Sequence, residues 1–174
     1  LTTTSEAEMP ISLILHAGHH KTATSSFQKL CTNIRAKLLE KKIYFPTING
    51  DGNMYLACYA AQKDDWSIFE KLLQHGINFL EGDGTILLSA EDLENALYDY
   101  EFAKKLSYLA ELQGINSIKW VFVNRNQFDY FDSLYAQLSK DGQILRYDIM
   151  AKHILKNGIF SCSIPRYRWH FIFD

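Results

Sequence analysis

The residues best suited to chemistry lie in one short stretch near the start of the chain. After Gly18 the sequence has a lysine, Lys21, and three hydroxyl side chains close to it, Thr22, Thr24 and Ser25. An ammonium group and several hydroxyls can together hold the oxygens of a phosphate or a similar anion. The stretch therefore indicates an anion-binding loop.

The segments on either side of this loop would present it to a ligand. Residues 11–16 form an aliphatic run that predicts a buried strand, and residues 24–42 have the spacing of a helix with one apolar face. The apolar positions of that face are Phe27, Leu30, Cys31, Ile34 and Leu38. A strand, a short loop and a helix N-terminus make an anion site, because the free backbone N–H groups and the positive end of the helix dipole both face the loop.

The loop differs from the Walker A phosphate-binding motif. That motif requires G-x-x-x-x-G-K-[ST], and here only one glycine, Gly18, precedes Lys21. The hydroxyls at positions 24 to 26 could also cap the helix. An ordinary turn between a strand and a helix is therefore the alternative to phosphate binding.

Strands alternate with helices along the rest of the chain, which indicates an α/β fold with a central parallel sheet. We expect further strands over residues 85–89 and 118–123, and a short extended piece at residues 43–46. The expected helices cover residues 54–62, 66–75, 91–112, 127–139 and 147–156. The apolar middle of residues 85–89 is typical of a parallel strand that is buried on both faces.

Charged side chains follow the ends of the three main predicted strands. They are Lys21, Glu91 and Arg125, and Ser133 lies eight residues after Arg125. Ligands of open α/β sheets sit beyond the C-terminal ends of the strands, so these groups would form an anion site with an acid or base beside it. Simpler explanations exist, since Arg125 could pair with Asp129 and Ser133 could be a solvated helix position. Glu91 could occupy the first turn of a helix, where acids are favoured.

Three motifs occur in order within residues 11–140. They are HAGHHKTATSS at His16–Ser26, LLSAE at Leu87–Glu91 and VFVNRNQFDYFDSLY at Val121–Tyr135. Together they resemble the PAPS-dependent sulfotransferase family, and most of all its bacterial branch, whose first motif is similar to H-x-G-x-H-K-T-[GA]-[TS]-[TS]. The resemblance implies a P-loop-NTPase-like central parallel sheet flanked by helices. It also implies transfer of the sulfuryl group of PAPS to a hydroxyl acceptor, a carbohydrate or glycolipid.

The same resemblance implies roles for the residues of the loop. Residues 20–25 would form the loop that binds the 5′-phosphosulfate. Lys21 would hold the bridging oxygen and stabilise the leaving phosphate. The other cofactor-binding positions of the loop would be His20, Thr22, Ala23, Thr24 and Ser25.

Two further roles follow from the resemblance. Arg125 and Ser133 match the pair that binds the 3′-phosphate, the group that distinguishes PAPS from ATP. Glu91 lies at the strand end where relatives carry a catalytic base, and His20 is a second candidate for that base. The resemblance implies PAPS as the cofactor and 3′,5′-ADP as its product, with no metal required.

Length and composition indicate one globular domain. The chain has 174 residues, of which 47% are apolar, enough for one sizeable core. We expect a flexible N-terminal tail over residues 1–10 and a single α/β domain over residues 11–174. The apolar segment at residues 169–174 suggests that this domain is incomplete at its C-terminus.

Charge and cysteine content limit the partners and the compartment. The net charge of −2 disfavours broad electrostatic binding of nucleic acid. Three widely spaced cysteines make a poor disulfide framework, which predicts a reducing, cytoplasmic location. No apolar run approaches the ~18 residues that a membrane-spanning helix needs. We therefore expect a small-molecule or glycan acceptor, no nucleic acid and no membrane span.

The remaining polar and aromatic residues are open to other assignments. His16, His19 and His20 lie close together, but their spacing matches neither H-E-x-x-H nor a zinc finger. Residues 165–170 combine cations with aromatics and could bind an anionic sugar, stack on a base or form a surface segment. The ten tyrosines and eleven phenylalanines are compatible with a sugar-binding wall. An ATP-dependent small-molecule kinase and a nucleotide-binding homologue without activity are the alternative functions.

Overall fold

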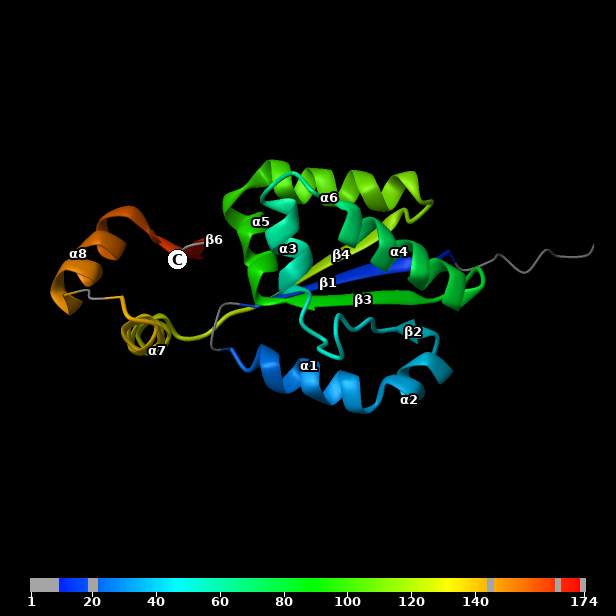
Figure 1. The fold of residues 1–174 in the computed structure, drawn as a ribbon, viewed down its shortest axis with the longest axis horizontal. Coiled ribbons are helices and arrows are strands. Elements are labelled where there is room, and N and C mark those ends of the chain that lie inside the picture. The colour runs from blue at the N-terminus through cyan, green and yellow to red at the C-terminus, as the bar shows by residue number, and fades with distance from the viewer. Residues whose placement is uncertain (1–9, 19–21, 144–145, 165–166, 173–174) are drawn as a thin grey trace, which may run out of the picture.

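A four-stranded, all-parallel sheet forms the centre of the protein (Figure 1). The computed structural model describes residues 10–18, 22–143, 146–164 and 167–172. The strands are β1 (Ser12–Gly18), β2 (Ile43–Tyr44), β3 (Thr85–Ala90) and β4 (Ser117–Val123), in the order β2-β3-β1-β4. The predicted α/β class with a parallel sheet is confirmed.

The register of the sheet brings three strand ends to one edge. Gly18 at the end of β1 is paired with Val123 at the end of β4, and Ala17 is paired with Ala90 at the end of β3. In a parallel sheet, the segments that follow paired strand ends leave from the same edge. The loop before α1, the turn after β3 and the loop after β4 therefore start close together.

Helices cover both faces of the sheet (Figure 1). One face carries α1 (Thr24–Asn33) and α2 (Arg35–Glu40), and the other carries α3 (Tyr55–Ala61), α4 (Ser67–Leu80) and α6 (Tyr100–Leu112). The 3₁₀ turn η1 (Glu91–Glu94) and α5 (Asn95–Tyr98) follow β3 directly. Beyond the C-terminal ends of the strands lie α7 (Gln127–Lys140) and α8 (Tyr147–Asn157), followed by the antiparallel hairpin of β5 (Ile159–Ile164) and β6 (Tyr167–Ile172). None of the described helices has the length and apolar character that crossing a bilayer would need.

The helix predicted over residues 24–42 is two helices, with a break at Ile34. Its buried side consists of Thr24, Gln28 and Cys31, whereas Leu30, which we expected on that side, is 55% exposed. Polar side chains occupy the buried face because they make hydrogen bonds to residues of β3 and η1. The prediction from apolar spacing was therefore wrong at Leu30.

The helix predicted over residues 91–112 is also divided. It begins as η1 and α5 and is interrupted at Asp99, whose backbone is extended. The Asp99 carboxylate accepts hydrogen bonds from the N–H groups of Glu101 and Phe102, at 3.1 and 3.2 Å. Asp99 thus caps a new helix, α6, since a carboxylate at this position satisfies donors that the helix leaves open.

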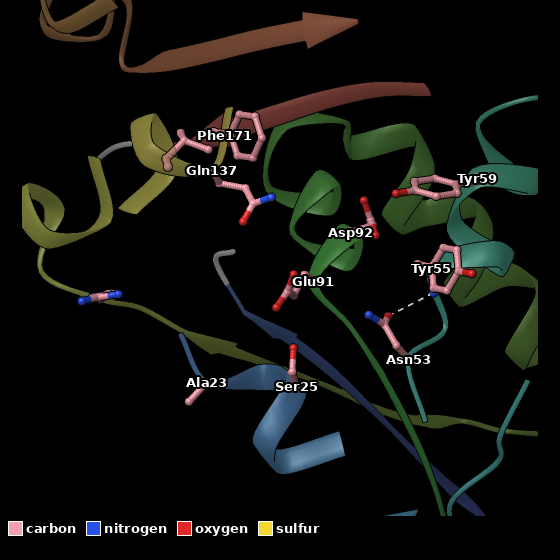
Figure 2. A pocket seen from close by; sticks show the side chains of 11 residues that line it. Ala23, Ser25, Asn53, Tyr55, Tyr59, Glu91, Asp92, Gln137 and Phe171 are labelled. Carbon is pink, nitrogen blue, oxygen red and sulfur yellow. Dashed lines mark hydrogen bonds between the residues drawn. The ribbon is translucent and has the colours of Figure 1, made fainter. Parts of the chain in front are cut away.

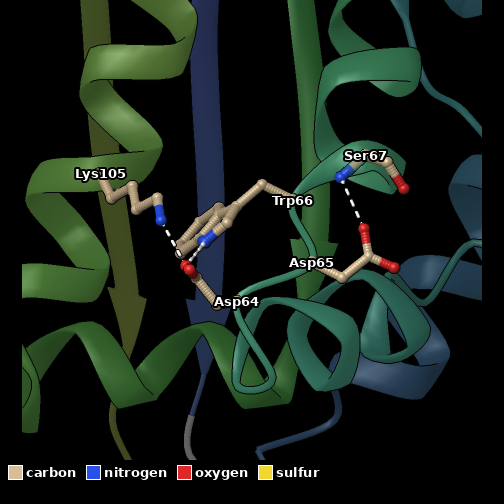
Figure 3. Close-up of polar contacts among 5 residues, drawn as sticks. All are labelled: Asp64, Asp65, Trp66, Ser67 and Lys105. Atoms are coloured by element: carbon tan, nitrogen blue, oxygen red, sulfur yellow. Dashed lines mark hydrogen bonds and ion pairs between the residues drawn. The ribbon is translucent and has the colours of Figure 1, made fainter.

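The turn between α3 and α4 is held by side-chain contacts (Figure 3). Asp64 accepts hydrogen bonds from the Trp66 indole, at 3.1 Å, and from Lys105 of α6. Asp65 accepts from the backbone N–H of Ser67, at 3.1 Å, in the first turn of α4. The hydrogen bonds from Lys105 and then from Trp66 lower the pKa of Asp64. Both aspartates are exposed, so these contacts orient the turn more than they stabilise the fold.

Two apolar clusters hold the protein together. The larger lies between the sheet and α3, α4 and α6, and includes Leu13, Leu88 and Phe69, which are fully buried. The smaller joins α7, α8 and β6, and consists of Tyr130, Leu134, Leu138, Met150, Ile154 and Phe171. Our sequence analysis assigned no specific element after residue 158, where the structure has the β5–β6 hairpin.

We expect the substitution Leu88→Ala to destabilise the fold strongly. Leu88 is fully buried in β3, and removing a buried leucine side chain typically lowers the free energy of unfolding by about 2–5 kcal/mol. Urea denaturation measures the loss. The control is Leu155→Ala in α8, because Leu155 is 87% exposed and should change the free energy by less than about 0.5 kcal/mol. If both variants lost the same free energy of unfolding, the buried position of Leu88 in β3 would be contradicted.

Candidate functional site

A cavity of about 520 Å³ lies at the edge where the strand ends meet (Figure 2). Its lining comes from the start of α1, the residues before and within α3, η1, the loop after β4, α7 and β6. The lining residues are Ala23, Ser25, Asn53, Tyr55, Tyr59, Glu91, Asp92, Arg125, Leu134, Gln137 and Phe171. Four residues that the sequence predicted for the site thus share this cavity: Ala23, Ser25, Glu91 and Arg125.

Helix α1 begins without a side-chain cap. Its N-cap residue is Ala23, which has φ 65° and makes no side-chain cap hydrogen bond. This left-handed conformation costs an L-residue other than glycine roughly 1–2 kcal/mol, and such strain gathers at binding sites. The first backbone N–H groups of a helix have no partner within the helix, and here Ala23 and Ser25 both line the cavity.

Gly18 at the end of β1 lies close to the side chains of Thr22 and Thr24. A Cβ atom on Gly18 would lie 2.6 Å from Cγ2 of Thr24 and 2.7 Å from Oγ1 of Thr22. Any larger residue at position 18 would therefore displace the side chains of Thr22 and Thr24. The hydroxyl-bearing residues Thr22 and Thr24 are packed against the end of β1.

Thr24 links α1 to the turn after β3. Its side chain is 1% exposed, and its Oγ1 donates a hydrogen bond to Oε1 of Glu91. Glu91 is the first residue of η1 and lines the cavity. The structure thus brings together a predicted phosphate-binding hydroxyl and the predicted base, and Thr24 orients the Glu91 carboxylate.

A buried polar cluster fixes α1 beneath the site. Nδ1 of His16 in β1 lies 2.8 Å from Oγ of Ser89 in β3, and the Gln28 amide donates to the same Oγ at 3.1 Å. The His16 ring also packs against Phe27, with centroids 4.4 Å apart. Burial lowers the pKa of His16, and in its neutral form the ring nitrogen Nδ1 can accept a hydrogen bond from the Ser89 hydroxyl. The sequence pattern alone did not predict a supporting role for these positions.

Arg125 and Ser133 lie together, as their predicted pairing requires. Nη1 of Arg125 donates a hydrogen bond to Oγ of Ser133, at 3.1 Å. Asn126 supports this arrangement by capping α7, since its side chain accepts from the N–H groups of Phe128 and Asp129. The cap starts the helix directly after Arg125, so Ser133, two turns along, faces back toward the arginine.

Tyr130 of α7 packs in the smaller apolar cluster, within electrostatic range of the turn that carries Glu91. Its side chain is buried, and burial raises the pKa of its phenol, with the carboxylates of Glu94 and then Glu91 adding to the effect. The phenol is therefore neutral and lies near both acids.

The remaining predicted loop residues, His20 and Lys21, lie outside the described residues, as does His19. Their roles stay predictions from the sequence. In the part of the chain that the structure describes, no three His, Cys, Asp or Glu side chains are grouped so that they could hold a metal ion.

Several lining residues were missed by sequence reasoning. Asn53, Tyr55, Tyr59 and Asp92 are contributed by the segment before α3, by α3 and by η1. Two features of the sequence could have indicated these residues. Asn53 directly precedes a predicted helix, and in the structure its side chain accepts a hydrogen bond from the N–H of Tyr55, at 3.1 Å. Tyr55 and Tyr59 are four residues apart, which places them on one face of that helix.

Comparisons with known proteins add no assignment: no protein-family model, curated protein or solved structure matches this chain. The fold and the cavity therefore define the class by themselves. It is an α/β domain with a parallel sheet and a polar cavity at the C-terminal edge of the strands.

Proposed function

We propose that the protein is a sulfotransferase of P-loop-like fold that transfers the sulfuryl group of PAPS to a hydroxyl acceptor, a carbohydrate or glycolipid. One observation carries the proposal. The start of α1 and Arg125, which are about a hundred residues apart in the sequence, line the same cavity. A nucleotide with two separate anionic ends would need such a pair of binding points.

The residues around the cavity fit 3′,5′-ADP and PAPS. The N-terminus of α1 offers backbone N–H groups and a positive dipole end for the 5′-phosphate. Arg125, hydrogen bonded to Ser133, offers a guanidinium for the 3′-phosphate. The volume of about 520 Å³ lies within the range of small-molecule sites, roughly 300–1,000 Å³.

Two side chains would supply groups for the chemistry, Glu91 and Lys21. Glu91, oriented by Thr24, would accept the proton of the attacking acceptor hydroxyl. Lys21 and the N-terminus of α1 would offset the charge on the leaving phosphate. When bound, PAPS supplies a sulfuryl group whose bond to the bridging phosphate oxygen breaks as the new bond from sulfur to the acceptor oxygen forms.

Thermal unfolding with different nucleotides tests the proposal. A ligand that binds the native state raises its stability, by about 2.7 kcal/mol at a hundred times Kd. We expect 3′,5′-ADP to raise the Tm more than ATP with magnesium does at equal concentration. A larger shift with magnesium ATP would favour a kinase, and no shift with either nucleotide would refute nucleotide binding. A shift with 3′,5′-ADP but no transfer to any hydroxyl acceptor would indicate an inactive homologue.

We expect Arg125→Ala to weaken 3′,5′-ADP binding roughly 10- to 100-fold, because a hydrogen bond to a charged group contributes about 1.5–3 kcal/mol. Binding of 5′-AMP, which lacks the 3′-phosphate, should change little. Isothermal titration calorimetry measures both affinities. Arg146→Ala is the matched control, because Arg146 is exposed and pairs with Asp148 at 2.9 Å. If Arg125→Ala lost affinity equally for 3′,5′-ADP and 5′-AMP, the assignment of Arg125 to the 3′-phosphate would be contradicted.

A further inference from the structure

One wall of the cavity carries neither the start of α1 nor Arg125. It consists of Asn53, Tyr55, Tyr59 and Asp92, which we call the acceptor wall. Figure 2 shows these four side chains grouped on one side of the cavity, away from Ala23. The four residues are neighbours in the fold, because η1, which carries Asp92, contacts α3, which carries the two tyrosines.

The acceptor wall contains a pair of aromatic rings. Tyr55 and Tyr59 occupy one face of α3, with ring centroids 5.4 Å apart in an edge-to-face arrangement. Both residues are half-buried and both line the cavity. A tyrosine presents an apolar ring with a polar tip, so the pair can cover the C–H face of a ligand and contact its hydroxyls.

The charges on this side of the cavity are negative. Glu91 and Asp92 both line it, and Asp92 is 5% exposed. Burial, and then the Asp92 carboxylate, raise the pKa of the neighbouring Cys58 thiol well above its ordinary value. Among the lining residues that the structure describes, Arg125 is the single basic one. An anionic acceptor would meet two carboxylates in a partly desolvated site, which opposes its binding.

The hydrogen-bonding groups of the wall match hydroxyls better than an ammonium ion. The Asn53 amide and the two phenols of Tyr55 and Tyr59 can donate hydrogen bonds, and the Asp92 carboxylate can accept them. An ammonium group offers donors only, so where it replaces a sugar hydroxyl it leaves a donor of the wall without an acceptor. Sugar hydroxyls donate and accept, so they can use both kinds of group.

We infer that the acceptor wall binds an uncharged, polyhydroxylated acceptor, a neutral sugar, and selects against anionic sugars. This inference rests on the proposed sulfotransferase function. It deepens that function by assigning the charge class of the acceptor to four named residues.

The first test compares three probes that differ in charge: methyl glucoside, methyl glucuronide and methyl glucosaminide. Binding is measured by saturation-transfer NMR with 3′,5′-ADP present, and transfer is measured from PAPS. We expect the glucoside to exceed the glucuronide roughly tenfold in both, about the effect of 1.4 kcal/mol. Asp92→Asn should reduce the preference for the glucoside over the glucuronide, because it removes one negative charge from the wall. Preference for the glucuronide or the glucosaminide, or no binding of any of the three, would overturn the inference.

The second test separates the acceptor wall from the nucleotide site. Tyr59→Ala should weaken glucoside binding roughly tenfold, the scale of one lost aromatic contact, while the rise in Tm caused by 3′,5′-ADP stays the same. Tyr59→Phe should keep most of the binding. The matched control is Tyr108→Ala in α6, because Tyr108 is 57% exposed and does not belong to the acceptor wall.

The outcomes distinguish the two proposals. If 3′,5′-ADP stabilises the variants but Tyr59→Ala leaves glucoside binding unchanged, the assignment of sugar binding to the acceptor wall is wrong and the sulfotransferase proposal stands. If 3′,5′-ADP does not stabilise the unmodified protein, the proposed function fails and this inference fails with it.

Discussion

Replacing Lys21 with alanine is expected to slow sulfuryl transfer roughly 10²- to 10³-fold at saturating nucleotide, the range found when one preorganised electrostatic group is removed. The negative charge on the leaving phosphate grows as the bond to sulfur breaks. A lysine ammonium beside that phosphate stabilises the transition state more than the ground state. In the sequence, Lys21 falls between β1 and α1 and belongs to neither, so an alanine at this position should leave the Tm unchanged.

Single-turnover transfer from PAPS measures this effect apart from product release. Lys29→Ala is the matched control, because Lys29 is an exposed lysine of α1, five residues before the break at Ile34. The control should transfer at the rate of the unmodified protein. Unchanged single-turnover transfer by Lys21→Ala would remove the central assignment of the loop.

Replacing Glu91 with glutamine should lower the transfer rate by roughly 10²- to 10⁴-fold, the usual contribution of a general base. The amide has the size of the carboxylate and can still accept the hydrogen bond from Thr24, so the site should keep its shape. It cannot take up a proton from the acceptor hydroxyl. We therefore expect kcat to fall while the affinity for 3′,5′-ADP stays the same.

The test for Glu91 is kcat as a function of pH, together with the Kd for 3′,5′-ADP. The unmodified protein should lose activity as pH falls and the base becomes protonated, and Glu91→Gln should lack that limb. Glu111→Gln is the matched control, since Glu111 is an exposed residue of α6. Full turnover by Glu91→Gln would assign the base to His20, the other candidate.

Sequence reasoning predicted those cavity-lining residues whose positions depend on local pattern. Apolar runs marked β1, β3 and β4, and the polar residues just after them had to meet at one edge because parallel strands align their C-terminal ends. Arg125 and Ser133 lie within hydrogen-bonding distance for a related reason. A helix that starts directly after the arginine places a residue two turns along on the same side.

The same reasoning failed where burial is decided between distant segments. Leu30 looked like a core residue by spacing, but the side of α1 that contacts the sheet is occupied by Gln28 and Cys31. Gln28 is buried because Ser89, 61 residues away, accepts its hydrogen bond. A sequence pattern carries no record of such a partner, so apolar spacing alone selected the wrong side chain.

By itself, then, the sequence determined an alternation of strands and helices, a parallel sheet and the strand ends that carry Glu91 and Arg125, because these follow from short-range periodicity and chain direction. The tertiary structure alone decided the strand order β2-β3-β1-β4, the contact between Thr24 and Glu91, and the acceptor wall. Those features depend on packing between segments tens of residues apart, which local spacing does not encode.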